Sequence, residues 1–147
     1  KRRLEMIRRL SEAGIPVRIQ VSPLIPALTD HELEAVMEAG RDAGATLANS
    51  IPLRLPLEVA GLFRRWLDTT VPDSAARVMG RVRELHGGRD YDPEFGTRMT
   101  GQGIWADLIR KRADIARKRL GLGAGMAPLR TDLFRPPPRA GDQLAMF

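Results

Sequence analysis

The chain has 147 residues, the length of one ordinary domain, and 43% of them are hydrophobic, which is enough to bury a core. It contains no cysteine, so disulfides and thiolate-ligated clusters are excluded within this chain. No run of about 18 apolar residues occurs, so the sequence predicts no transmembrane helix and a cytoplasmic location. The net charge of +6 favours an anionic partner such as nucleic acid, although a solvated basic helix face would give the same composition.

The first elements predicted are a helix and a strand. Residues 2–13 place apolar side chains at helical spacing, and Gly14 can supply the left-handed residue that ends such a helix. Residues 17–22 then alternate apolar and polar side chains, as a strand does. Because Pro23 cannot donate to a sheet ladder, we expect this strand to finish near Ser22.

A second helix and strand follow. Thr29 and Glu32 have the spacing of a capping box, in which each side chain satisfies a main-chain amide, so a helix should begin there and stop at Gly44. Residues 46–55 are predicted to form the second strand. The expected inner face of the helix consists of Leu33, Val36, Met37 and Ala43.

Two further helices complete the regular part. A helix from Leu57 should turn an apolar stripe inward, and a second helix should begin with Asp73 as its N-cap. The stripe of the first consists of Val59, Leu62, Phe63, Trp66 and Leu67, and that of the second of Ala75, Val78, Met79, Val82 and Leu85. Alternation of helices and strands with short loops predicts an α/β fold with parallel strands.

The chain divides into three parts on this interpretation. Residues 1–85 are expected to be the C-terminal part of a partial (β/α) TIM-like barrel, because two parallel strands cannot make a sheet core alone. Residues 86–120 are a Gly-rich loop followed by a basic helix over 104–120, whose inner side we expect to hold Trp105, Leu108, Ile109, Ala116 and Leu120. Residues 121–147 form a Pro/Gly-rich tail that should not pack as a domain.

Three segments carry a resemblance. QVSPLIPALTDHE, SIPLRLP and RELHGGRDYDPEFGTRMTGQG resemble the C-terminal half of radical S-adenosylmethionine proteins, in the branch related to spore photoproduct lyase and called DNA repair photolyase-like. The resemblance covers roughly residues 1–120. It implies a 4Fe-4S cluster on cysteines spaced CxxxCxxC, reductive cleavage of S-adenosylmethionine, and lyase-like chemistry. Those cysteines are absent, so this chain alone should hold no cluster or cofactor and no catalytic or metal-binding residue is assigned.

The resemblance implies that this chain forms the side of the cofactor site that contacts the adenine of S-adenosylmethionine. The two strand ends would pack on the adenine ring and hydrogen-bond its edge. The residues concerned are Ser22, Pro23, Leu24, Ile25, Leu53, Arg54 and Leu55. The plain alternative is that Leu24, Ile25 and Leu53 are core residues. In the Gly-rich loop, Arg89, Tyr91 and Arg98 could reach a substrate or DNA, or could pin the loop at the surface.

The last five residues, QLAMF, look like a peptide that docks bacterial repair proteins onto the DNA sliding clamp. An extended tail with apolar anchors suits a groove on a partner. Its candidate contacts are Gln143, Leu144, Met146 and Phe147. The alternative is that this peptide covers an apolar patch of its own protein.

The function predicted is therefore that of the C-terminal part of a radical S-adenosylmethionine enzyme that acts on DNA, with the missing N-terminal barrel half as its partner. Two alternatives stay open. One is a non-catalytic basic module that binds DNA or the sliding clamp, and the other is part of another barrel enzyme such as an aldolase. For the aldolase no lysine is available in a strand, since Lys1, Lys111 and Lys118 all lie in predicted helices.

Overall fold

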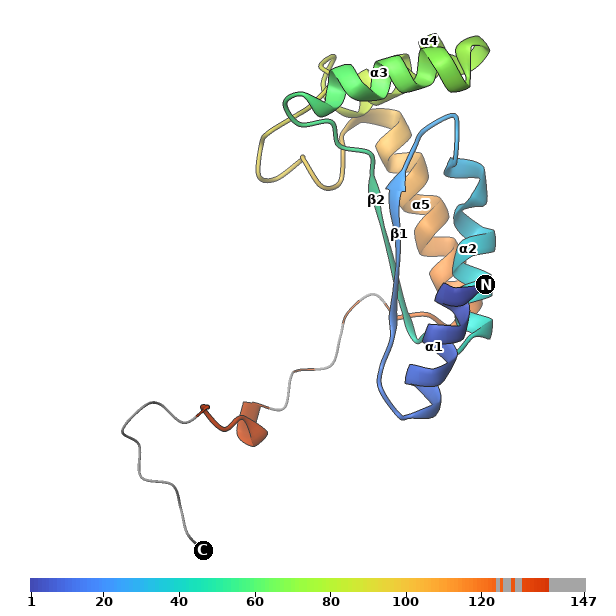
Figure 1. Cartoon of the computed structure of the whole chain (residues 1–147), viewed down its shortest axis with the longest axis vertical. Coiled ribbons are helices and arrows are strands. Elements are labelled where there is room, and N and C mark those ends of the chain that lie inside the picture. The colour runs from blue at the N-terminus through green and yellow to red at the C-terminus, as the bar shows by residue number, and fades with distance from the viewer. Residues whose placement is uncertain (124, 126–127, 129–130, 138–147) are drawn as a thin grey trace, which may run out of the picture.

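The computed structural model describes residues 1–123, 125, 128 and 131–137 and shows a mixed α/β fold with two strands in parallel. Figure 1 shows the order of the elements along the chain. They are α1 (Arg2–Glu12), β1 (Arg18–Leu24), the 3₁₀ turn η1 (Asp30–Glu32), α2 (Leu33–Asp42), β2 (Leu47–Pro52), α3 (Val59–Thr70), α4 (Pro72–Leu85), α5 (Gly103–Leu120) and the 3₁₀ turn η2 (Thr131–Leu133). None of the described helices is long and apolar enough to cross a membrane.

The two strands pair in parallel, as the sequence predicts. Arg18 lies opposite Leu47 and Val21 opposite Ser50, and the register then slips before Leu24 meets Pro52. The first strand runs two residues beyond Ser22, where we expected it to end, and so includes Pro23. Pro23 is tolerated because it lies within the slip, where no regular ladder bond is lost. On the other edge of β2, the Gly123 carbonyl accepts the amide of Ala48 at 3.1 Å.

The helices lie on one side of this sheet and at its carboxyl end. Figure 1 shows α1, α2 and α5 along one side of the strands, while α3 and α4 lie across the end where the strands finish. Helix α2 approaches β1 closely at Gly40, since a Cβ there would lie 2.3 Å from Cδ1 of Ile19. The opposite side of β1 carries Arg18, Gln20 and Ser22, which are all exposed.

Two apolar clusters hold the chain together. The first lies between the sheet and helices α2 and α5, and its large buried members are Ile19, Val21, Leu24, Leu33, Met37 and Ile109. The second joins the segment after β2 to the helical pair α3–α4, and it contains Leu53, Leu55, Leu67, Ala75, Val78, Met79 and Val82. The predicted inner face of α4 is confirmed in full, because all five of its residues are buried.

Several local predictions are wrong. The Thr29 hydroxyl does not cap the helix but accepts the Ile25 amide at 2.9 Å, which leaves no capping box. Helix α4 begins at Pro72, so Asp73 lies inside its first turn rather than at the N-cap. The missed inward positions share one cause, which is that the described residues cover them only in part. They are Val36 at 39% exposed, Val59 at 37%, Leu62 at 54%, Trp66 at 44% and Leu108 at 43%.

Helices α2 and α5 are also joined by an ion pair. Arg112 donates from Nε and Nη2 to the two carboxylate oxygens of Glu34, at 2.8 and 2.7 Å, and from Nη2 to the Asp30 carbonyl at 2.8 Å. This bidentate geometry is the strong form of an arginine–carboxylate pair. The hydrogen bonds from Arg112 lower the pKa of Glu34 below its ordinary value of 4.5.

We predict that Arg112→Gln lowers the free energy of unfolding by about 1–2 kcal/mol, because two charge-assisted hydrogen bonds between helices are lost. Denaturant titration at pH 7 measures this. Arg110→Gln is the matched control, since Arg110 pairs with Asp107 on the surface of the same helix, and its effect should stay within about 0.5 kcal/mol. Equal effects of the two substitutions would contradict the prediction.

The same pair should make stability depend on acid. A carboxyl whose folded pKa is lowered contributes stability that is present above its unfolded pKa and is lost as the pH falls through the folded value. Unfolding free energy should therefore decline as the pH drops below about 4.5. In Arg112→Gln this decline should be shallower. An identical decline in both proteins would show that Glu34 does not contribute.

Candidate functional site

The candidate site lies at the carboxyl end of the sheet, where the chain leaves β2 and the segment of residues 86–102 folds back against it. The main-chain amide and the main-chain carbonyl of Leu53 are both hydrogen-bonded. Its amide donates to the Leu24 carbonyl at 2.9 Å, and its carbonyl lies 2.9 Å from Nε2 of His86. The ends of both strands and the end of α4 are thereby held at one point.

The tautomer of His86 follows from this contact. A carbonyl oxygen only accepts, so Nε2 must carry the hydrogen and the neutral ring leaves Nδ1 as an acceptor. His86 is 1% exposed, and its Nδ1 is buried without a hydrogen-bond partner in the described structure. The position of His86 at the end of a predicted helix favours a structural role over metal ligation, but nothing in its neighbours predicts a partner 33 residues away.

Beside His86 lies Asp92, a buried carboxylate that is 5% exposed. It accepts hydrogen bonds from the Thr97 hydroxyl and, at 3.0 Å, from the Glu94 amide. The bond from Thr97, followed by that from the Glu94 amide, lowers the pKa of Asp92 below its ordinary 3.8. Asp92 is therefore ionised at neutral pH, and its hydrogen bonds order the turn that carries Arg98.

The structure brings together two residues that the sequence analysis assigned to different roles. Arg54, expected on the cofactor side, donates from Nη2 to the hydroxyl of Tyr91, expected on the substrate side, at 3.0 Å. Its guanidinium also lies 5.6 Å from the centre of the Tyr91 ring, and Nη1 lies 3.1 Å from Sδ of Met99. Met99 had no predicted role, since a contact across 45 residues leaves no local signal.

The other predicted site residues are spread around this point. Ser22 and Pro23 are exposed and Ile25 is half-buried, whereas Leu24 and Leu55 are each 1% exposed and Leu53 is 8% exposed. Leu24 and Leu53 thus have the burial of core residues, which is the alternative the sequence left open for them and for Ile25, which is only half-buried. Leu55, for which no such alternative was considered, is also buried. Arg98 lies over the Phe95 ring at 5.0 Å, and Arg89 lines a hollow of about 510 Å³ with His86 and Asp92. The residues of the terminal QLAMF peptide lie outside the described residues.

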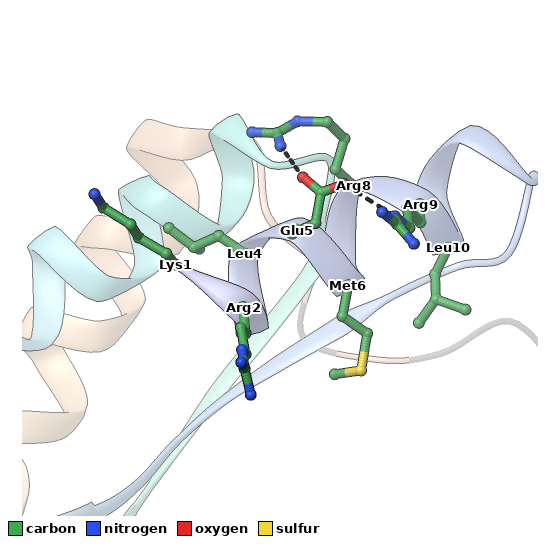
Figure 2. A pocket seen from close by; sticks show the side chains of 8 residues that line it. All are labelled: Lys1, Arg2, Leu4, Glu5, Met6, Arg8, Arg9 and Leu10. Atoms are coloured by element: carbon green, nitrogen blue, oxygen red, sulfur yellow. Dashed lines mark hydrogen bonds and ion pairs between the residues drawn. The ribbon is translucent and has the colours of Figure 1, made fainter.

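Another hollow lies elsewhere and does not coincide with this chemistry. It runs along α1, has a volume of about 790 Å³ and is lined by residues of that helix alone. Figure 2 shows Glu5 bound to Arg8 and Arg9, with Met6 and Leu10 on one side of the helix. One helix cannot enclose a ligand, so we interpret this hollow as an uncovered helix face. Among the described residues, no group of three or more histidine, aspartate or glutamate side chains could hold a metal ion.

Comparison with known proteins gives limited information. No protein-family model matches the chain, and no solved structure gives a significant match. The chain is 31% identical over 111 residues to an uncharacterized protein of Mycobacterium bovis and to two uncharacterized proteins of Mycobacterium tuberculosis. The matched segment covers 74% of this chain and 31% of each relative, so the chain spans about a third of the length of these curated relatives.

We predict that the neutral ring of His86 is the Nε2–H tautomer, and that His86→Ala frees the carboxyl end of β2. The substitution leaves the Leu53 carbonyl without its buried donor and opens a cavity, so unfolding free energy should fall by about 2–4 kcal/mol. The nitrogen shifts of the imidazole report the tautomer, and amide exchange at residues 53–55 reports the local opening. An Nδ1–H ring, or unchanged exchange in the variant, would contradict this account.

Proposed function

We propose that this chain is the C-terminal part of a radical S-adenosylmethionine enzyme of the branch related to spore photoproduct lyase. On this proposal β1 and β2 are later strands of a partial (β/α) TIM-like barrel, and the whole protein carries out lyase-like radical chemistry on DNA in the cytoplasm. The observation that carries the proposal is the parallel pair itself, whose carboxyl ends converge on Leu53, Arg54 and the segment of residues 86–102. Ligands bind at that end of parallel sheets in barrel enzymes.

The uncovered surfaces of the sheet support a partner of the same architecture. Among the described residues, β1 pairs with β2 and with no second strand. A sheet of two strands is marginal alone, and a long open edge favours pairing with a further strand. We propose that the N-terminal barrel half supplies this strand.

The residues of this chain do not fit an iron–sulfur cluster. Such clusters need thiolate ligands, and the chain has no cysteine. A cluster would therefore have to be ligated by a part of the protein outside this chain.

The carboxyl end of the sheet fits one side of a nucleoside. Pro23 and Ile25 offer apolar contact, and Ser22 offers a polar group that is exposed. Leu53 is the weakest of the predicted contacts, because its amide is used and its carbonyl already accepts one bond. Bound S-adenosylmethionine supplies the radical chemistry of this enzyme class. The part of this chain would be to orient the nucleoside and to exclude water with the segment of residues 86–102.

A nucleic-acid substrate is supported by the surface of α5. Its exposed basic side chains are Arg110, Lys111, Lys118 and Arg119. Basic side chains along one helix neutralise backbone phosphates without reading the sequence. The same surface would serve a non-catalytic DNA-binding module, so activity of the whole protein decides between the two functions.

We predict that the gene encodes a CxxxCxxC motif upstream of Lys1, and that the full-length protein, reconstituted with iron and sulfide without oxygen, absorbs as a 4Fe-4S protein. With a reductant it should convert S-adenosylmethionine to 5′-deoxyadenosine, measured by chromatography. Replacing the motif cysteines with alanine is the control and should abolish both signals. Absence of the motif would contradict the enzyme assignment. So would a well-folded full-length protein with neither the 4Fe-4S absorbance nor 5′-deoxyadenosine formation.

A further inference from the structure

Arg54 differs from the half-buried Arg112 in having no acidic partner among the described residues. Arg112 is neutralised by Glu34. By contrast, no carboxylate among the described residues lies within ion-pair distance of Arg54, whose two polar contacts are the uncharged Tyr91 hydroxyl and the Met99 sulfur. A thioether sulfur is a weak acceptor. The positive charge is therefore held in place without being compensated.

The burial of Arg54 makes this arrangement costly. Its Nε is shielded from water and has no hydrogen-bond partner in the described structure. A charged group withdrawn from water without a counter-charge is unfavourable unless a bound group supplies one. A solvated surface arginine would keep Nε in water, so Arg54 is not simply a solvated surface residue.

The remaining donors define what can bind. A guanidinium has five N–H groups. Arg54 uses one on Nη1 and one on Nη2, which leaves a second hydrogen on each terminal nitrogen. The planar fork of a guanidinium matches two oxygens of one oxyanion.

We propose that Arg54, oriented by Tyr91, recognises a phosphate group at the carboxyl end of the sheet, and that the natural ligand is a nucleic-acid phosphodiester. This deepens the proposed function by naming the chemistry through which substrate is held. Arg98 belongs to the segment that contacts Arg54 through Met99, and its own Nε is also buried and without a partner in the described structure. The excess of basic residues over the whole chain points the same way.

The test is an NMR titration of the whole ¹⁵N-labelled chain with inorganic phosphate, with ionic strength held constant by chloride. The Nε–H signal of Arg54 should be observable because it is shielded from water, and it should shift and saturate. A six-residue oligothymidylate should shift the same signal at lower concentration, and acetate at higher concentration. A shift that does not saturate, or acetate binding as tightly as phosphate, would overturn the proposal.

Three variants make the titration specific. Arg54→Gln, followed through the amides of Tyr91 and Met99, should weaken phosphate binding roughly tenfold or more. Arg3→Gln, which removes the same charge from the exposed surface of α1, should bind as the wild type does. If Arg54→Gln fails to fold, Arg54→Lys keeps the charge and loses the fork, and wild-type affinity in it would overturn the proposal. The titration needs no cluster, so its failure and the failure of the enzyme assignment are separate results.

Discussion

The site depends on the two hydrogen bonds made by the main chain of Leu53. One bond goes back to Leu24 at the end of β1, and the other comes from His86 at the end of α4. The side chain of Leu53 belongs to the second apolar cluster, while Leu24 belongs to the first. Leu53 is therefore where the sheet layer and the α3–α4 pair meet. Because both its main-chain groups are used internally, the exit of β2 is a fixed platform, and Arg54 leaves that platform in a defined direction.

Much of the architecture follows from periodicity in the sequence. The alternation of helices and strands with short loops predicted parallel strands, and the spacing of apolar residues predicted the buried face of α4. Periodicity failed where a regular stripe is covered only in part. Leu62 and Trp66 repeat at helical spacing on α3, yet they are exposed. An apolar pattern indicates which side chains favour burial. Whether they are buried depends on another element or a partner that packs against them. Within the described residues that packing is incomplete.

The site was much less accessible from the sequence. The resemblance indicated the ends of both strands, but the pairing of Arg54 with Tyr91 joins positions 37 residues apart, and residue 91 belongs to a segment without any period. Thr29 shows the same limit at short range. Its spacing to Glu32 fits a capping box, yet its hydroxyl is taken by the Ile25 amide on its other side. Which of several main-chain amide donors reaches a hydroxyl acceptor is decided by the path of the main chain, which local spacing does not encode.

The uncovered apolar surfaces and the uncompensated charge of Arg54 have related causes. A protein keeps apolar side chains exposed and a guanidinium half-buried when something outside the described residues completes them. The two kinds of surface lie on different parts of the structure. Trp66 and Leu62 are on α3, and the open edge of β1 is on the sheet, so both suit a large protein surface. Arg54 contacts Tyr91 and Met99, and its guanidinium charge suits an oxyanion. A protein partner that covers the apolar surfaces would thus leave Arg54 without a counter-charge. A ligand bearing a phosphate would leave the apolar face of α3 exposed. The fold needs both, which is the arrangement expected when a substrate site lies at the edge of one half of a larger sheet.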